Sequence, residues 1–169
     1  MDGDQFVKKA YASILAHDFE QAISWFEQAI AADPGNASYH YKLSITCARS
    51  NKLHKAIEHA QKAIELNKTR EEYQFHLYNL RAKDLIIHAG KYLHYDNRNH
   101  LMAISLLKQA IALDPLAIEA FLLMGVAYAG LEDYNYAIQA IKEALVLDPQ
   151  HETASELLTE YIKKQKKNS

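Results

Sequence analysis

The chain has few of the residues that interrupt regular structure, with 5 Gly and 3 Pro among 169 residues. Long uninterrupted segments remain, and they are rich in residues that tolerate a helix. Cys47 is the only cysteine, so the chain cannot form an internal disulfide and needs no oxidising compartment. No stretch approaches the roughly 18 apolar residues of a membrane span, and the first residues lack the apolar segment of a signal peptide. We therefore expect an all-α, cytoplasmic protein without a membrane partner.

The chain also lacks a strong charge of either sign. It has 19 Lys and Arg against 21 Asp and Glu, which gives a formal net charge of −2. Nucleic-acid binders carry a marked basic excess, so we expect no nucleic-acid partner.

Signs of catalysis are missing as well. The sequence has no glycine-rich phosphate loop and no nucleophile elbow. Nine histidines are present, but His54 and His59 are five residues apart, which is not the i, i+4 spacing that puts two imidazoles on one helical face. His40 takes an apolar position of its segment and is expected to be half-buried, and Cys47 is expected to pack as a small hydrophobe. The sequence predicts no enzyme, no metal site and no cofactor.

What the chain does contain is an internal repeat. Ala22 recurs as Ala56 and Ala103 recurs as Ala137, each at a step of 34 along the chain. Asp-Pro pairs stand at one phase of the repeat, at 33–34, 114–115 and 148–149. The step from Ala56 to Ala103 is 47, which indicates an insertion of thirteen residues there. Repeats of this length stack side by side and expose a long binding surface.

The final copy shows how each repeat folds. Phe121, Gly125 and Tyr128 follow helical spacing, and a second helical stripe begins at Ala137 after a short turn. Small residues at these positions let two helices approach closely. Pro149 ends the second helix, because the residue before a proline is disfavoured in the α region. Each copy is therefore expected to be a helix-turn-helix unit.

This pattern resembles the tetratricopeptide repeat family, which combines a large apolar residue, Leu-Gly and Tyr in a first helix with Ala, an aromatic residue, Ala and Pro in the second. The matching residues here are Phe121, Met124, Gly125, Tyr128, Ala137, Ile141, Ala144 and Pro149. The resemblance implies one domain, a right-handed superhelix of four repeats at about 3–36, 37–70, 71–117 with the insertion, and 118–151. Residues 152–167 are expected to form a capping helix over the last repeat.

In that family the first helices line a concave groove. The resemblance places in it Lys8, Tyr11, Tyr41, Lys42, Ile45, Arg49, Phe75, His76, Asn79, Lys83, Leu122 and Val126. Such a groove is basic and aromatic at one end and apolar at the other, which suits a peptide or helix that carries carboxylates. The alternative is that the cations are merely solvated.

The insertion gives the third copy its individuality. We expect its first helix to run to about Ala89, with Gly90 at the helix end in the left-handed conformation and a loop over 90–99. Two interpretations stay open for the side chains here: packing on the neighbouring repeat, or contact with a partner or another copy. The residues considered for the contact are Leu85, Ile86, Tyr92, His94 and Tyr95.

The resemblance implies a non-catalytic scaffold that binds a peptide or helix of another protein, with an acidic segment as the expected partner. A dedicated secretion-type chaperone and a unit that self-assembles into homo-oligomers through the insertion are the alternatives. Some family members hold a C-terminal carboxylate with a clamp of Lys and Asn residues. Val7, Tyr11 and Ile45 stand at the corresponding places here, which disfavours that clamp.

Overall fold

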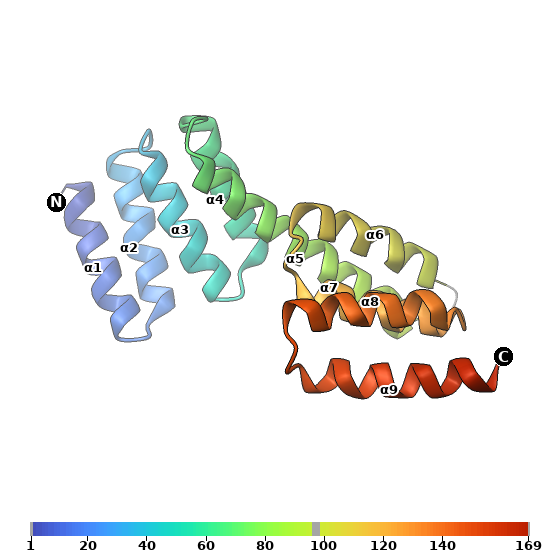
Figure 1. Cartoon of the computed structure of the whole chain (residues 1–169). Helices are drawn as coiled ribbons and strands as arrows, with labels where there is room; N and C mark the ends of the chain where they lie inside the picture. The colour runs from blue at the N-terminus through green and yellow to red at the C-terminus, as the bar shows by residue number, and fades with distance from the viewer. Residues whose placement is uncertain (1, 96–98, 169) are drawn as a thin grey trace. The chain divides into compact units, whose positions relative to one another are not determined.

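The computed structural model describes residues 2–95 and 99–168, and this part of the chain is all-α, as predicted, with nine helices and no strand (Figure 1). The helices are α1 (Gly3–Leu15), α2 (Phe19–Ala32), α3 (Ala37–Arg49), α4 (Leu53–Leu66), α5 (Glu71–Tyr95), α6 (His100–Leu113), α7 (Ile118–Gly130), α8 (Tyr134–Leu147) and α9 (Glu152–Lys167). They form two compact units, Met1–Leu80 and Arg81–Ser169, here called the N-terminal unit and the C-terminal unit. Helix α5 contributes to both.

The helix pairs follow the repeat seen in the sequence. The pairs α1–α2, α3–α4, α5–α6 and α7–α8 each lie inside one of the four segments of the expected repeat. Asp2, Asp18 and Asp133 begin helices by accepting a hydrogen bond from the backbone N–H three residues later, which satisfies a donor that the first helical turn leaves free. Because the chain divides into two units, the division into four repeats stays a prediction.

The turn inside a helix pair has the same conformation in three copies. His17, Asn51 and Glu132 each have a positive φ, of 59°, 58° and 59°. His17 and Asn51 are 34 residues apart, which is one ordinary step of the repeat. Asn51 and Glu132 are 81 residues apart, which is one ordinary step of 34 and the longer step of 47 together. This left-handed residue turns the chain from the first helix into the second.

In the N-terminal unit, α1 packs on α2, α2 on α3 and α3 on α4 (Figure 1). Phe26 and Leu43 are its largest fully buried side chains, and Ala10 and Ala56 are buried beside them. Alanines at these positions allow neighbouring helices to lie close together. Cys47 is also fully buried, which confirms the expected packing role.

The C-terminal unit has two apolar clusters. One surrounds Leu107 and joins α5, α6 and α7, and the other surrounds Ile141 and joins α7, α8 and α9. Gly125 lies against this second cluster, since a Cβ there would come within 2.6 Å of Ile141 Cδ1 and 3.3 Å of the Ala137 carbonyl oxygen. Only a residue without a side chain lets α7 and α8 pack this closely.

The predicted C-terminal helix is present as α9, which packs on α8. Ala154 and Tyr161 are buried on its inner face, whereas Glu156, Glu160 and Lys163 are exposed on the other. An inner apolar face and an outer polar one are what the terminal helix of a repeat stack needs.

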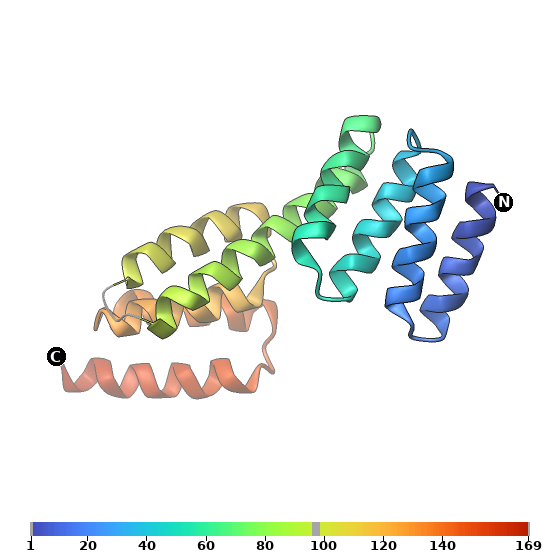
Figure 2. The same cartoon turned by 180° about the vertical axis from the view of Figure 1, so that it is seen from behind.

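The predicted end of the first helix of the third copy, at about Ala89, is wrong. Helix α5 is 25 residues long and continues through Gly90 to Tyr95 (Figure 2), and no described glycine has a positive φ. A glycine inside a helix costs only about 1 kcal/mol relative to alanine. Leu93, almost one turn later, packs against the Leu107 cluster and favours continuation.

The predicted loop over 90–99 is therefore mostly helix, with Tyr92 and His94 on α5. Three residues of the expected turn, 96–98, lie outside the described residues.

Candidate functional site

The N-terminal unit has a hollow of about 320 Å³ on the side of its first helices. It is lined by Tyr11, Ile14, Phe26, Lys42, Ile45, Thr46 and Arg49. Four of these, Tyr11, Lys42, Ile45 and Arg49, are residues that the sequence places in a groove. The structure thus brings together side chains from α1 and α3 over the buried ring of Phe26 in α2.

The floor of this hollow is aromatic. Phe26 is 1% exposed. The rings of Phe26 and Tyr11 meet edge to face, with 6.0 Å between their centroids. Tyr11 itself is 46% exposed. The Thr46 hydroxyl donates to the Lys42 carbonyl oxygen over 2.9 Å, so it needs no further acceptor. An apolar or aromatic guest side chain would meet apolar surface here.

Two cations stand beside the floor. Lys42 Nζ lies 6.0 Å from the centre of the Tyr11 ring, and Arg49 is exposed. Neither forms an ion pair within the part of the chain that the structure describes, whereas Lys52 and Lys55 at the start of α4 pair with acidic residues of α2. The hollow therefore offers positive charge that no described carboxylate neutralises.

Next to the hollow, Tyr41 and His76 are held in a packed cluster. Tyr41 lies 4.6 Å from Tyr73 and 5.3 Å from His76 between ring centroids. The Ser44 hydroxyl donates to the Ala56 carbonyl oxygen over 2.6 Å, so His76 Nε2, 2.9 Å from Ser44 Oγ, must be the donor in their bond. Burial raises the pKa of Tyr41 and lowers that of His76. These two predicted groove residues are fixed by their neighbours.

The other predicted groove residues do not line this hollow. Lys8 is exposed on α1, and Phe75 is 64% exposed on α5. Asn79 Oδ1 is a buried side-chain oxygen for which no described residue supplies a hydrogen bond. Lys83, Leu122 and Val126 belong to the C-terminal unit. A single groove through all four repeats stays a prediction.

The residues considered for an interface have different surroundings. Ile86 is 5% exposed and, with partly buried Leu85, packs in the Leu107 cluster. The helical period puts Ile86 on the buried face with Ala82 and Ala89, which favours the packing interpretation for this side chain over contact with a partner. Tyr92 is 38% exposed and His94 is exposed, and their contact with a partner stays a prediction. The Tyr95 side chain lies outside the described part.

A histidine pair lies between α3 and α4. His40 Nδ1 is 3.0 Å from His59 Nδ1. The His40 ring also donates a hydrogen bond to the backbone carbonyl of Pro34. His40 is 6% exposed, more buried than the sequence suggested. Burial lowers the pKa of both imidazoles. Two facing nitrogens form one N–H···N bond when one of them carries a proton. No group of three metal-ligating side chains occurs among the described residues.

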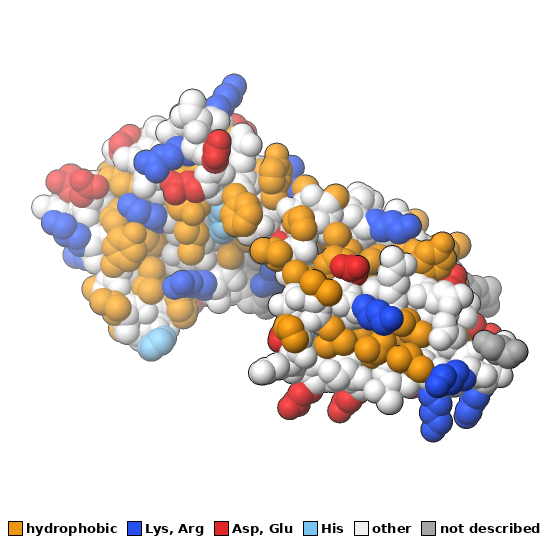
Figure 3. All heavy atoms as spheres, viewed as in Figure 1, with side chains coloured by type: hydrophobic (Ala, Val, Ile, Leu, Met, Phe, Trp, Pro, Cys, Tyr) orange, Lys and Arg blue, Asp and Glu red, His pale blue; other side chains and the backbone are white. Residues whose placement is uncertain are grey.

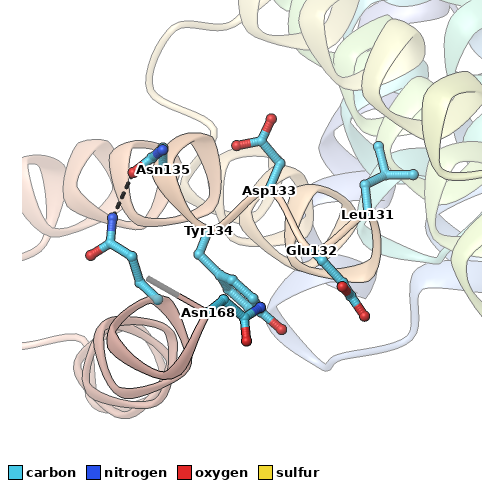
Figure 4. Close-up of a pocket in the computed structure, with 7 residues that line it drawn as sticks. Leu131, Glu132, Asp133, Tyr134, Asn135 and Asn168 are labelled. Carbon is cyan, nitrogen blue, oxygen red and sulfur yellow. Dashed lines mark hydrogen bonds between the residues drawn. The ribbon is translucent and has the colours of Figure 1, made fainter.

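The C-terminal unit has a polar hollow of about 390 Å³ beside the turn between α7 and α8 (Figure 4). Tyr134 points toward Asn168, the residue that follows α9, and Gln165 Nε2 of α9 donates to Asn135 Oδ1 over 2.6 Å. Asp133 already caps the start of α8. The polar groups thus mainly serve to join α8 to α9.

A further hollow, of about 240 Å³, was not predicted from the sequence. It lies between α6 and α8 and is lined by Lys108, Met124, Tyr128, Tyr136, Gln139, Ala140 and Glu143. The sequence does contain a pattern that could have indicated this hollow. Tyr136 and Glu143 are seven residues apart, so they lie on one polar and aromatic stripe on the solvent side of a second helix. The apolar pattern of the second helices indicates only their core-facing side.

Within the described residues, no helix is both long enough and apolar enough to cross a membrane.

Comparison with known proteins identifies the family. A family model described as tetratricopeptide repeat matches residues 9–71 and 92–152, which is more than half of the chain. No curated protein matches significantly. Among solved structures, a MamA protein is 22% identical with a TM-score of 0.53, covering 98% of this chain and 88% of that one.

YrrB, described as a TPR protein with an unusual peptide-binding site, is 21% identical with a TM-score of 0.53, covering 91% of this chain and 73% of its own. MamA of Desulfovibrio magneticus RS-1 is 17% identical with a TM-score of 0.53, covering 98% and 96%. At these identities the likeness concerns the fold alone. Together with the family model and the repeated helix pairs, it shows that this chain belongs to the tetratricopeptide repeat family.

Proposed function

We propose that this protein is a non-catalytic interaction scaffold whose N-terminal unit binds an acidic segment of another protein. Tetratricopeptide repeats generally mediate protein–protein interaction. The observation that carries the proposal is the hollow over Phe26, which combines apolar surface with the unpaired charges of Lys42 and Arg49.

The size of the hollow favours a peptide or a helix rather than a folded surface. About 320 Å³ accommodates one or two large side chains. An aromatic or aliphatic anchor would pack between Tyr11 and Ile45, and a carboxylate nearby on the same segment would reach Arg49. YrrB is a protein of similar fold described as having a peptide-binding site, which supports peptide binding by this arrangement of helices.

Arg49 is expected to contribute most of the charge selectivity. Its guanidinium can donate two parallel hydrogen bonds to one carboxylate, and a hydrogen bond to a charged group contributes about 1.5–3 kcal/mol. Lys42 is a point charge on a flexible stem and adds a weaker, less directional attraction.

Binding rather than reaction is also supported by the state of the chain's thiol. Cys47 lies in the core, and burial raises its pKa, which keeps it protonated.

To test the proposal, a displayed library of 12-residue peptides is selected against the full chain, and the best peptide is measured by fluorescence anisotropy. We expect selected peptides to combine an aromatic or aliphatic residue with Asp or Glu. Arg49→Glu should weaken binding by about tenfold or more, since losing one charge-assisted contact costs more than about 1.4 kcal/mol.

Lys68→Glu is the matched control, because Lys68 is exposed in the turn before α5 and does not line the hollow. It makes the same change of net charge and should alter affinity by less than about twofold. Equal losses in the two variants would mean that only net charge matters, and selection of peptides without acidic residues would refute the assignment.

A further inference from the structure

We propose that the C-terminal unit carries a second, separate binding surface: the trough between α6 and α8, which takes an amphipathic helix of a partner protein. The walls of this trough are the second helices α6 and α8, whereas the walls of the N-terminal hollow are the first helices α1 and α3. It does not depend on the function proposed above.

The trough has two helical walls and an aromatic floor. Lys108 comes from α6, Tyr136 and Glu143 come from α8, and Met124 and Tyr128 come from α7 beneath them. The rings of Tyr128 and Tyr136 stack with 5.2 Å between centroids and 26° between planes. The stack fixes Tyr136 although this side chain is 55% exposed, so its outer face is a preorganised apolar contact.

Apolar surface extends along the α6 wall. Leu101 is seven residues before Lys108, as Tyr136 is seven residues before Glu143, so each pair follows one stripe of its helix. Leu101 is 70% exposed and its neighbour Met102 is 50% exposed. In Figure 3, hydrophobic side chains gather over α6 and α8, with charged side chains of both signs among them. Large apolar side chains exposed together mark an interaction surface.

The spacing fits a helical occupant. Seven residues of a helix span about 10.5 Å, or two turns. A helix lying along the trough would place apolar side chains on one face at intervals of three or four residues, which is the usual way in which an amphipathic helix enters a groove. One apolar side chain would lie near Leu101 and Tyr136, and another, one turn later, would lie near Met124 and Ala140. The polar flanks of the occupant, two turns on, would face Lys108 and Glu143.

The charges give the occupant a preferred orientation. Lys108 and Glu143 line opposite walls, and neither forms an ion pair with the other or with any residue in the described ranges. An occupant with a carboxylate on the flank facing α6 and a cation on the flank facing α8 would satisfy both. The inverted arrangement would set like charges against each other.

The test uses a displayed library of 20-residue amphipathic helices with randomised flanks, selected against the full chain. Selected helices should carry Asp or Glu on one flank and Lys or Arg on the other. In fluorescence anisotropy with the best helix, we expect Tyr136→Lys to weaken binding about tenfold or more, because it replaces the central aromatic contact with a charge. Lys108→Glu should weaken it about fivefold.

Lys142→Glu is the matched control, because Lys142 is exposed on α8 but does not line the trough. It should change affinity less than about twofold. The double variant Lys108→Glu, Glu143→Lys should prefer a helix whose charged flanks are exchanged. Circular dichroism of each variant must match the wild type, and that match is expected because the altered side chains lie on the surface.

Arg49→Glu should leave helix binding unchanged, and Tyr136→Lys should leave binding of the acidic peptide unchanged, so the two sites can fail separately. Loss of helix binding in Arg49→Glu would overturn the second site. So would unchanged affinity in both Tyr136→Lys and Lys108→Glu. A wild-type dimer that light scattering shows to become a monomer on Tyr136→Lys would overturn the foreign helix in favour of a second copy.

Discussion

The two units fill the same repeat position in opposite ways. Ser44 of α3 and Gly125 of α7 are equivalent, because one ordinary step and the longer step together separate them. In the N-terminal unit the Ser44 hydroxyl links the Ala56 carbonyl to His76. In the C-terminal unit the absence of a side chain at Gly125 lets Ile141 approach. One helix-pair geometry is thus held by hydrogen bonds in one place and by close apolar packing in the other.

The contrast extends beyond this position. The N-terminal unit contains the His40–His59 pair and two ion pairs that join α2 to the start of α4. The exposed ion pairs contribute little to stability because solvent screens them, but the buried bonds fix how the helices meet. Repeats that share a backbone pattern can therefore respond differently to a mutation or to pH.

The largest effect is expected from filling the close contact in the C-terminal unit. Gly125→Val should destabilise the protein by about 2–3 kcal/mol, because added methyl groups would overlap Ile141 and the Ala137 carbonyl. Urea unfolding followed by circular dichroism measures the loss. Ile141→Ala in the same chain should be less harmful than it is alone, since it makes room for the valine; strictly additive losses would mean that the two positions do not compete for space.

A smaller loss is expected from the matching position of the N-terminal unit. Ser44→Ala should cost about 1–3 kcal/mol, because it leaves His76 without the Ser44 hydroxyl and the Ala56 carbonyl with only its helical hydrogen bond. Trp25 is the chain's single tryptophan and stacks on Phe6 in this unit, so its fluorescence reports unfolding there. Ser105→Ala, at an exposed position of α6, should stay within about 0.5 kcal/mol of the wild type. Equal stability of Ser44→Ala and the wild type would contradict the role of this bond.

The smallest effect is expected from pH. Burial lowers the pKa of His40, His59 and His76 below the ordinary 6.5. The folded state therefore prefers neutral imidazoles, and the stability they contribute is complete above about pH 6.5 and falls as the pH drops further. The charged side chains that act on His40 and His59 are Lys55, Lys62, Glu27 and Glu58, and Glu65 lines the hollow beside them.

Urea midpoints from Trp25 fluorescence should decrease between about pH 7 and pH 5. In His59→Gln the decrease should be shallower, because one of the groups that must stay neutral is gone. A slope as steep as in the wild type would show that other groups set the pH dependence.

The fold could be predicted because its determinants are local and repeated. Alanines at helix crossings, Asp-Pro pairs after second helices and short turns recur from one copy to the next, and each alone favours the observed helix pairs. The end of α5 could not be predicted, because Gly90 also fits a helix end. The contact of Leu93 with the Leu107 cluster, which favours the longer helix, is made by residues distant in the sequence.

The binding surfaces were predicted unevenly for a related reason. Tyr11, Lys42, Ile45 and Arg49 were placed by family register, and the structure brings them to one hollow. The trough between α6 and α8 depends on which stripes of two second helices face each other across α7. No single segment of the sequence contains that relation, so it emerged only from the structure.

The outer face of α9 limits how copies of this protein could associate. Its solvent side carries Glu156, Glu160, Lys163 and Lys164, and no large apolar side chain is exposed on this helix among the described residues. A filament that grew end to end through α9 would have to strip water from these charges without an apolar gain. Association of copies through the outer face of α9 is therefore disfavoured.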